Sequence, residues 1–189
     1  MKINEFINLE LSTITNLPLS EINQLIDKLN DALINKQRIY LLGNGGSSAS
    51  AAHICNDFNK LIFNKTENRF QIINLCSDTS YILAIANDIS YEEIFKRQMF
   101  NSLTSNDLVI ALSGSGNSKN VINAIKYASE MKAYTIGLSG YDGGELNTLV
   151  DLGMHINVNN MQVVEDMHMM IFHLIYNYFI NTYEEKSSK

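Results

Sequence analysis

The first part of the chain places apolar residues at intervals of three and four, which is the spacing of one face of an α-helix. A similar pattern covers residues 3 to 16, and the only proline, Pro18, separates it from a second segment at 20–36. The apolar face of that second segment is formed by Ile22, Leu25, Ile26, Leu29, Ala32 and Leu33. We therefore expect two helices before the first strand.

Further along, four short runs are apolar at nearly every position: RIYLL at 38–42, FQIINL at 70–75, DLVIALS at 107–113 and AYTIGLS at 133–139. The first three precede helix-like segments at 48–60, 77–100 and 114–132, and the fourth precedes a glycine-bearing loop. Apolar strands that alternate with helices predict a parallel sheet covered on both faces. With a last helix at 161–183, the pattern predicts an α/β fold, a doubly wound open parallel sheet flanked by helices and extended by helices at both ends.

The length of 189 residues suits one domain. Its expected parts are N-terminal helices at 3–36, an α/β core at 38–158 and the helix at 161–183. A net charge of −6 argues against a nucleic-acid partner, because phosphate backbones are bound by clustered Lys and Arg. No run predicts a membrane span or a signal peptide, and Cys55 and Cys76 are typical of buried thiols in a reducing compartment. We expect a cytoplasmic protein without a membrane partner.

Two loops carry the candidate chemistry, GNGGSS at 43–48 and SGSGNS at 113–118. Ligands of open parallel sheets bind beyond the carboxyl ends of the strands, where both loops are expected. Glycines free backbone N–H groups, and four or five donors at helix N-termini can hold a phosphate without a lysine. The candidate donors are Ser47, Ser113, Ser115 and Ser118. The third glycine of a dinucleotide fingerprint and the lysine of a P-loop are missing, so no nucleotide cofactor is expected.

Ionisable residues occur at two further places. His53 and Asp57 are four residues apart, on one face of the helix after the first loop. The last helix carries Glu165, Asp166, His168 and His173 among apolar residues, where each is either hydrogen-bonded in the core or functional. Because that helix is apolar nearly all round, we expect it to pack against a second copy of the chain, with the site near the interface.

Taken in order, these residues resemble a known family. GNGGS, a histidine six residues after its serine, DTS, ND, SGSGNS and two histidines five residues apart in the last helix are similar to the phosphoheptose isomerases of the SIS (sugar isomerase) fold group. The resemblance covers roughly residues 20 to 180. It implies isomerisation of sedoheptulose 7-phosphate to D-glycero-D-manno-heptose 7-phosphate through an enediol, and a homotetramer. It places the substrate against Asn44, Gly45, Gly46, Ser47, Asp78, Ser113, Gly114, Ser115 and Ser118.

The chain departs from the family pattern in its acids. Asp57 stands where the family has a glutamate and Glu165 where it has a glutamine, so the side chain of Asp57 is about one C–C bond shorter. Asp57 is our first candidate for the catalytic base and Glu165 is the second. We expect His173 to move protons between the oxygens of the substrate.

The resemblance also allows a zinc ion as a cofactor, and its ligands would be His53, Asp57, Glu165 and His173. Glu165 and His173 are eight residues apart, which corresponds to about 12 Å along a helix and is too far for both to bind one ion. Glu165 must therefore lie before the helix, or the two residues must come from different subunits. Two other functions stay open: a regulatory SIS protein that binds a sugar phosphate without converting it, and an isomerase of another sugar phosphate.

Overall fold

The computed structural model of the chain describes residues 1–61 and 68–184. Its centre is a five-stranded sheet with the strand order β2-β1-β3-β4-β5, and every neighbouring pair is parallel. The strands are β1 (Arg38–Gly43), β2 (Gln71–Asn74), β3 (Leu108–Ser113), β4 (Tyr134–Ser139) and β5 (Leu152–His155). This confirms the predicted doubly wound α/β fold.

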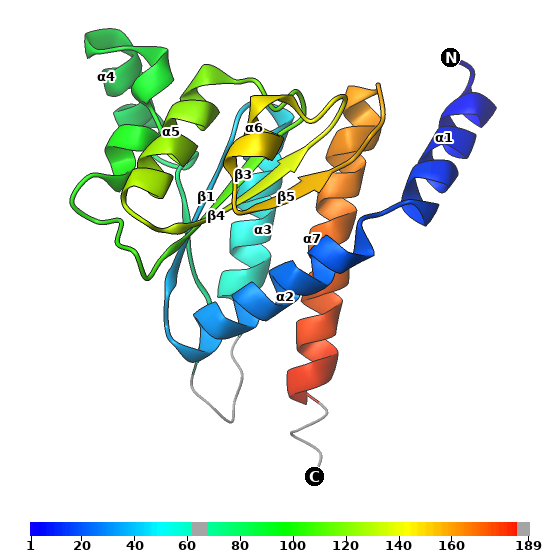
Figure 1. Cartoon of the computed structure of the whole chain (residues 1–189), viewed down its shortest axis with the longest axis horizontal. Helices are drawn as coiled ribbons and strands as arrows, with labels where there is room; N and C mark the ends of the chain where they lie inside the picture. Colours follow the sequence, from blue (N-terminus) through cyan, green and yellow to red (C-terminus); the bar gives the residue numbers. More distant parts are fainter. Residues whose placement is uncertain (62–67, 185–189) are drawn as a thin grey trace.

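Helices cover both faces of this sheet (Figure 1). On one face, α2 (Leu19–Ile34), α3 (Gly46–Asn59) and α7 (Met161–Glu184) pack on Ile39, Leu41, Ile110 and Leu112 of the sheet. On the other face, α5 (Lys119–Glu130) and α6 (Gly144–Leu149) pack on the alternate positions of the same strands. Strand residues that are buried from both sides explain why the runs are apolar throughout.

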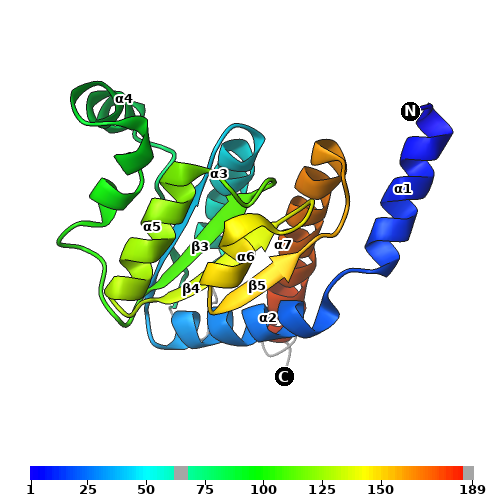
Figure 2. The same ribbon diagram turned by 45° about the horizontal axis from the view of Figure 1, so that its top comes forward.

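The first helix, α1 (Ile3–Thr15), contributes no fully buried residue and projects from the body beside the start of α7 (Figure 2). Ile3, Ile7 and Leu11 follow one another at intervals of four and are between 49% and 80% exposed. They form an apolar stripe on a helix that this chain alone leaves uncovered.

Two elements differ from the sequence expectation. The segment 77–100 is not one helix but α4 (Thr79–Asp88) followed by two short 3₁₀ turns, Tyr91–Glu93 and Lys96–Met99. The helix α4 has no fully buried side chain, and Ile82, Ile85 and Ala86 pack on the core only partly, so little packing stabilises further turns. Strand β5 was not predicted, because it has only four residues and includes a glycine and a histidine.

The two cysteines are free and half-buried rather than fully buried. Burial raises the pKa of both thiols, which keeps them protonated and unreactive near neutral pH. None of the helices in the described part of the chain combines the length and the apolar character needed to cross a bilayer.

Candidate functional site

Two loops meet at the carboxyl edge of the sheet because the strands before them are neighbours. The first loop (43–48) follows β1 and the second (113–118) follows β3, and Gly43 pairs with Leu112 in the ladder between them. Together with the start of α7 they enclose a cavity of about 220 Å³, which we name the loop cavity. It is lined by Asn44, Gly45, Gly46, Ser47, Leu112, Ser113, Gly114, Ser115, Ser118, Met161 and Glu165.

The first loop turns into α3 at a glycine that its backbone requires. Gly45 is the N-cap of α3 and has a φ of 55°, which other residues rarely adopt. The N–H groups of Gly46 and Ser47, the first two residues of α3, have no partner within the helix. Both residues line the cavity together with three further serines, so residues with several potential donors to an anion surround it. None of the described residues lining it is a lysine or an arginine.

An amide pair joins the first loop to α5, which follows the second loop, and sequence reasoning missed half of this pair. Asn44 Nδ2 donates to Asn120 Oδ1 at 2.8 Å, and Asn120 Nδ2 donates back to Asn44 Oδ1 at 2.9 Å. The hydroxyl of Tyr91 donates to the same Asn44 oxygen at 3.0 Å. The sequence does contain a signal for this contact, because Asn120 is an amide on the otherwise apolar face of α5 and a buried amide needs a hydrogen-bond partner.

Glu165 reaches the first loop from α7. Its two carboxylate oxygens lie against the α-carbon of Gly46, in the space where any side chain larger than glycine's hydrogen would collide with them. Glu165 belongs to α7 and not to a segment before it, which excludes one of the two expected arrangements. Within one chain, the expected four-residue set is therefore incomplete, because this carboxylate lies in the loop cavity.

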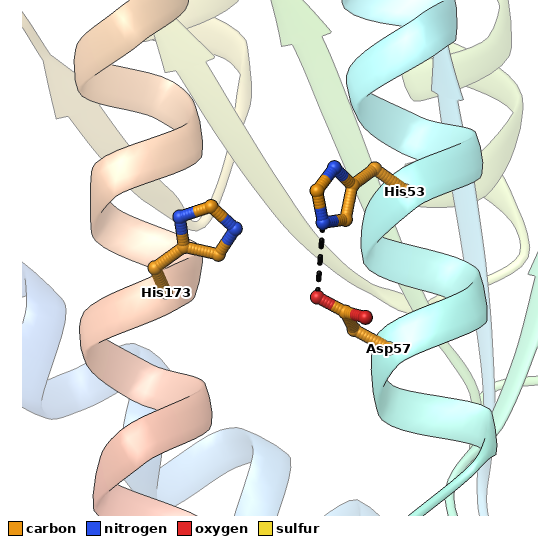
Figure 3. Close-up of side chains that lie close together, drawn as sticks. All are labelled: His53, Asp57 and His173. Carbon is orange, nitrogen blue, oxygen red and sulfur yellow. Dashed lines mark ion pairs between the residues drawn. The ribbon is translucent and has the colours of Figure 1, made fainter.

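The other three residues of that set form a cluster between α3 and α7 (Figure 3), here called the His-Asp-His cluster. His53 Nε2 lies 3.1 Å from Asp57 Oδ2, as expected for residues four apart on a helix. The ring of His173 faces the ring of His53 edge to face, with centroids 5.2 Å apart. One ligand atom from each residue lies within 4.8 Å of the other two.

Asp57 is held between two partners. Its Oδ1 accepts from Lys60 Nζ at 2.6 Å, while its Oδ2 faces His53. Burial raises the pKa of this carboxyl, but the hydrogen bonds and charges of Lys60 and His53 outweigh that effect and lower it overall. The carboxylate is therefore ionised near neutral pH. Lys60, three residues after Asp57, is the second residue that sequence reasoning missed.

The donor atoms of the cluster fit a zinc ion in type and number. Two imidazole nitrogens and one carboxylate oxygen are the protein ligands of several catalytic zinc sites, which leave a fourth position for water or substrate. Both histidines are exposed, so the site is open to a ligand. Contraction of the cluster by small side-chain movements would bring its donors to the distances of a coordination sphere.

Two expected residues lie elsewhere. Asp78 is the N-cap of α4, where its Oδ1 accepts from the backbone N–H of Tyr81 at 3.0 Å, and it does not line the loop cavity. Its contact with a sugar hydroxyl stays a prediction. His168 is 1% exposed, and burial lowers its pKa to about 4 despite a hydrogen bond with the backbone of Ser139. It is a neutral core residue near the end of β4.

The SIS domain family model matches residues 4–140. Among curated proteins, the phosphoheptose isomerase of Aliarcobacter butzleri is 41% identical over 146 residues, which are 77% of this chain and 76% of that protein. A probable phosphoheptose isomerase of Thermoplasma acidophilum is 35% identical over 160 residues, 85% of this chain and 87% of the relative.

Solved structures agree with the fold. A phosphoheptose isomerase from Francisella tularensis superposes with a TM-score of 0.85 at 22% identity, covering 93% of this chain and 94% of that one. A phosphoheptose isomerase from Neisseria gonorrhoeae superposes with a TM-score of 0.83 at 25% identity, covering 93% and 95%.

Proposed function

The chain belongs to the SIS domain family and, within it, to the phosphoheptose isomerases, and from this premise we propose that it converts sedoheptulose 7-phosphate into D-glycero-D-manno-heptose 7-phosphate. The observation that carries the proposal is the loop cavity, where Ser47, Ser113, Ser115 and Ser118 converge and no basic residue is found among the described residues of the lining. Hydrogen bonds to a charged group stabilise by about 1.5–3 kcal/mol each, so four hydroxyls and free N–H groups suffice for a phosphate ester.

Binding at the loop cavity orients the other end of the sugar. Ser47 and His53 are six residues apart on α3, which corresponds to about 9 Å along the helix axis. An extended seven-carbon sugar phosphate has a comparable length. A phosphate at the loop cavity therefore leaves C1 and C2 beside the His-Asp-His cluster, and this positioning lowers the barrier by fixing the reacting atoms.

In the reaction we propose, Asp57 removes the proton from C1 of the open-chain ketose and returns a proton to C2, with an enediol between the two steps. Its hydrogen bonds to Lys60 and His53 hold the carboxylate ionised and fixed in direction. His173 moves the proton between the oxygens on C1 and C2, which suits an imidazole near neutral pH. Glu165 is the second candidate for the base, but its side chain lines the loop cavity, at the phosphate end of a substrate bound in this way.

We further propose that His53, Asp57 and His173 hold a zinc ion in the active assembly, each through one donor atom, which leaves the second carboxylate oxygen of Asp57 and the second ring nitrogen of His173 for the proton transfers. Their donor types and proximity support this proposal. A zinc ion at this position supplies Lewis-acid polarisation of the carbonyl oxygen. A contribution from Glu165 to the same ion requires a second subunit, because within one chain its carboxylate lies against Gly46.

We propose a homotetramer in the cytoplasm. Support for association comes from the exposed apolar stripe of α1 and from Leu174 and Tyr178 of α7, which are 48% and 46% exposed. Support for the compartment comes from two free, half-buried cysteines. We also propose that residues 1–189 form a single domain.

The proposed activity is tested by incubating the protein with sedoheptulose 7-phosphate, and separately with ketose phosphates of five and six carbons, and following aldose C1 signals by NMR. We expect an aldose signal from the heptulose phosphate and much slower conversion of the shorter sugars. Binding without conversion would favour a regulatory protein that does not transform the sugar. Faster conversion of a shorter sugar would identify that sugar, and not sedoheptulose 7-phosphate, as the substrate.

A further inference from the structure

The loop cavity contains one carboxylate, that of Glu165, among neutral hydrogen-bond donors. Both of its oxygens lie against Gly46, at the beginning of α3. The helix macrodipole and the unpaired N–H groups of Gly46 and Ser47 favour a negative charge at that place. The carboxylate of Glu165 therefore lies next to a position that favours an anion such as a phosphate.

Among the lining residues that the structure describes, none carries a positive charge to compensate the carboxylate. The described residues that line the cavity include four serines, three glycines and one asparagine, but no lysine, arginine or histidine. Like charges in contact repel, and they repel more strongly near a protein surface than in bulk water. A phosphate dianion and the Glu165 carboxylate thus oppose each other when both are in the cavity.

The side chain of Glu165 is free to leave. Among the described residues, it has no ion pair or hydrogen bond with another side chain. The atoms of Glu165 nearest to Gly46 are those of the carboxylate, at the end of a flexible side chain. The helix beneath it is fixed, because the neighbouring Val163, Val164 and Met167 are completely buried. Rotation of the side chain, without movement of α7, is enough to clear the α3 N-terminus.

We propose that Glu165 is a tethered competitor of the substrate phosphate. Its carboxylate holds the anion position at the α3 N-terminus, and a phosphate ester binds there only when the carboxylate rotates out. The residue sets the affinity of the cavity for phosphate and favours ligands whose sugar part makes contacts strong enough to displace it. This inference rests on the proposed function, since it takes the loop cavity as the phosphate site.

The test is calorimetric titration of the wild-type protein and of Glu165→Gln with inorganic phosphate at low salt. Inorganic phosphate avoids any role that Glu165 has in proton transfer. The matched control is Glu130→Gln, which removes the same charge at the opposite end of α5 from Ser118, roughly 18 Å away along that helix. Glu165→Ala is a second variant, because it removes the charge without adding an amide donor.

We expect Glu165→Gln and Glu165→Ala to lower the Kd for phosphate at least tenfold, and Glu130→Gln to change it less than twofold. An unchanged or higher Kd in both Glu165 variants, with melting curves that show folded protein, would overturn the inference while leaving the isomerase proposal intact. Absence of phosphate binding in every protein, together with no conversion of sedoheptulose 7-phosphate, would overturn both.

Discussion

Asn44 and Asn120 exchange two hydrogen bonds across the edge of the sheet, at 2.8 and 2.9 Å, although they are 76 residues apart in sequence. Asn44 belongs to the first loop, and Asn120 is a buried residue of α5, two positions after Ser118. The pair therefore fixes the separation of the serines that the two loops contribute to the loop cavity. Asn44, which the family resemblance assigns to the sugar, also has this second partner within the protein.

Replacing Asn120 by alanine is expected to weaken phosphate binding about tenfold, because each lost hydrogen bond contributes about 0.5–1.5 kcal/mol to holding the loops together. Titration with inorganic phosphate measures the effect in Asn120→Ala, Asn44→Ala and the double variant. If the pair acts as a unit, the double variant binds no more weakly than the weaker single variant. Additive losses would show that the two amides act separately.

Ser115→Ala is expected to raise the KM for sedoheptulose 7-phosphate about tenfold or more, because it removes a donor to a charged group. The value of kcat should change less, since the phosphate end of the substrate lies away from the reacting carbons. Steady-state kinetics measure both. Ser129→Ala is the control, an exposed serine at the distant end of the helix that Ser118 begins. Equal KM values for the two variants would remove Ser115 from the phosphate site.

Zinc binding is expected to depend on His53 and His173. Equilibrium dialysis followed by elemental analysis should give about one zinc ion per chain in the wild type and much less in His53→Ala and His173→Ala. His155→Ala is the control, because His155 bonds to the carbonyl oxygen of Tyr141 and is not a member of the cluster. Retention of zinc in both cluster variants would place the ion elsewhere.

Because the imidazole of His168 is buried and neutral, we expect the free energy of unfolding to decrease in acid. The pKa of this imidazole falls from 6.5 to about 4 on folding, so between these values the unfolded chain binds the extra proton. Stability therefore decreases as pH falls through this window, by about 3 kcal/mol between pH 7 and pH 4 from this residue. Urea unfolding of the wild type and of His168→Gln at several pH values measures the difference. Parallel stability curves for the two proteins would contradict the assignment.

Much of the fold follows from the sequence pattern, and the reason is physical. Strands buried from both sides must be apolar throughout, and this made β1, β3 and β4 recognisable, whereas the edge strand β2 buries only Ile72 and was recognised from its run of strand-forming residues. The short strand β5 carries a weaker signal, since its Gly153 and His155 are only partly buried. The break after Asp88 could not be predicted, because the sequence does not reveal that α4 packs on the core through only a few partly buried side chains.

The site was predictable where its residues are close in sequence. The loops carry their glycines and serines in short motifs, and His53 and Asp57 have helical spacing. The partnership of Asn44 with Asn120 depends on which strands are neighbours, and a single sequence does not record this. The contact of Glu165 with Gly46 depends on the direction in which the glutamate side chain points from α7. The spacing of residues along the sequence does not determine this direction.

The central claim is that a phosphate held at the loop cavity presents C1 of the sugar to Asp57. It is tested most directly by NMR of sedoheptulose 7-phosphate in D₂O with the wild-type protein and with Asp57→Asn. The account predicts that the wild type introduces solvent deuterium at C1, and that Asp57→Asn does so at least tenfold more slowly while binding inorganic phosphate with unchanged affinity. Equal rates of deuterium entry in the two proteins, or none with the wild type, would contradict it.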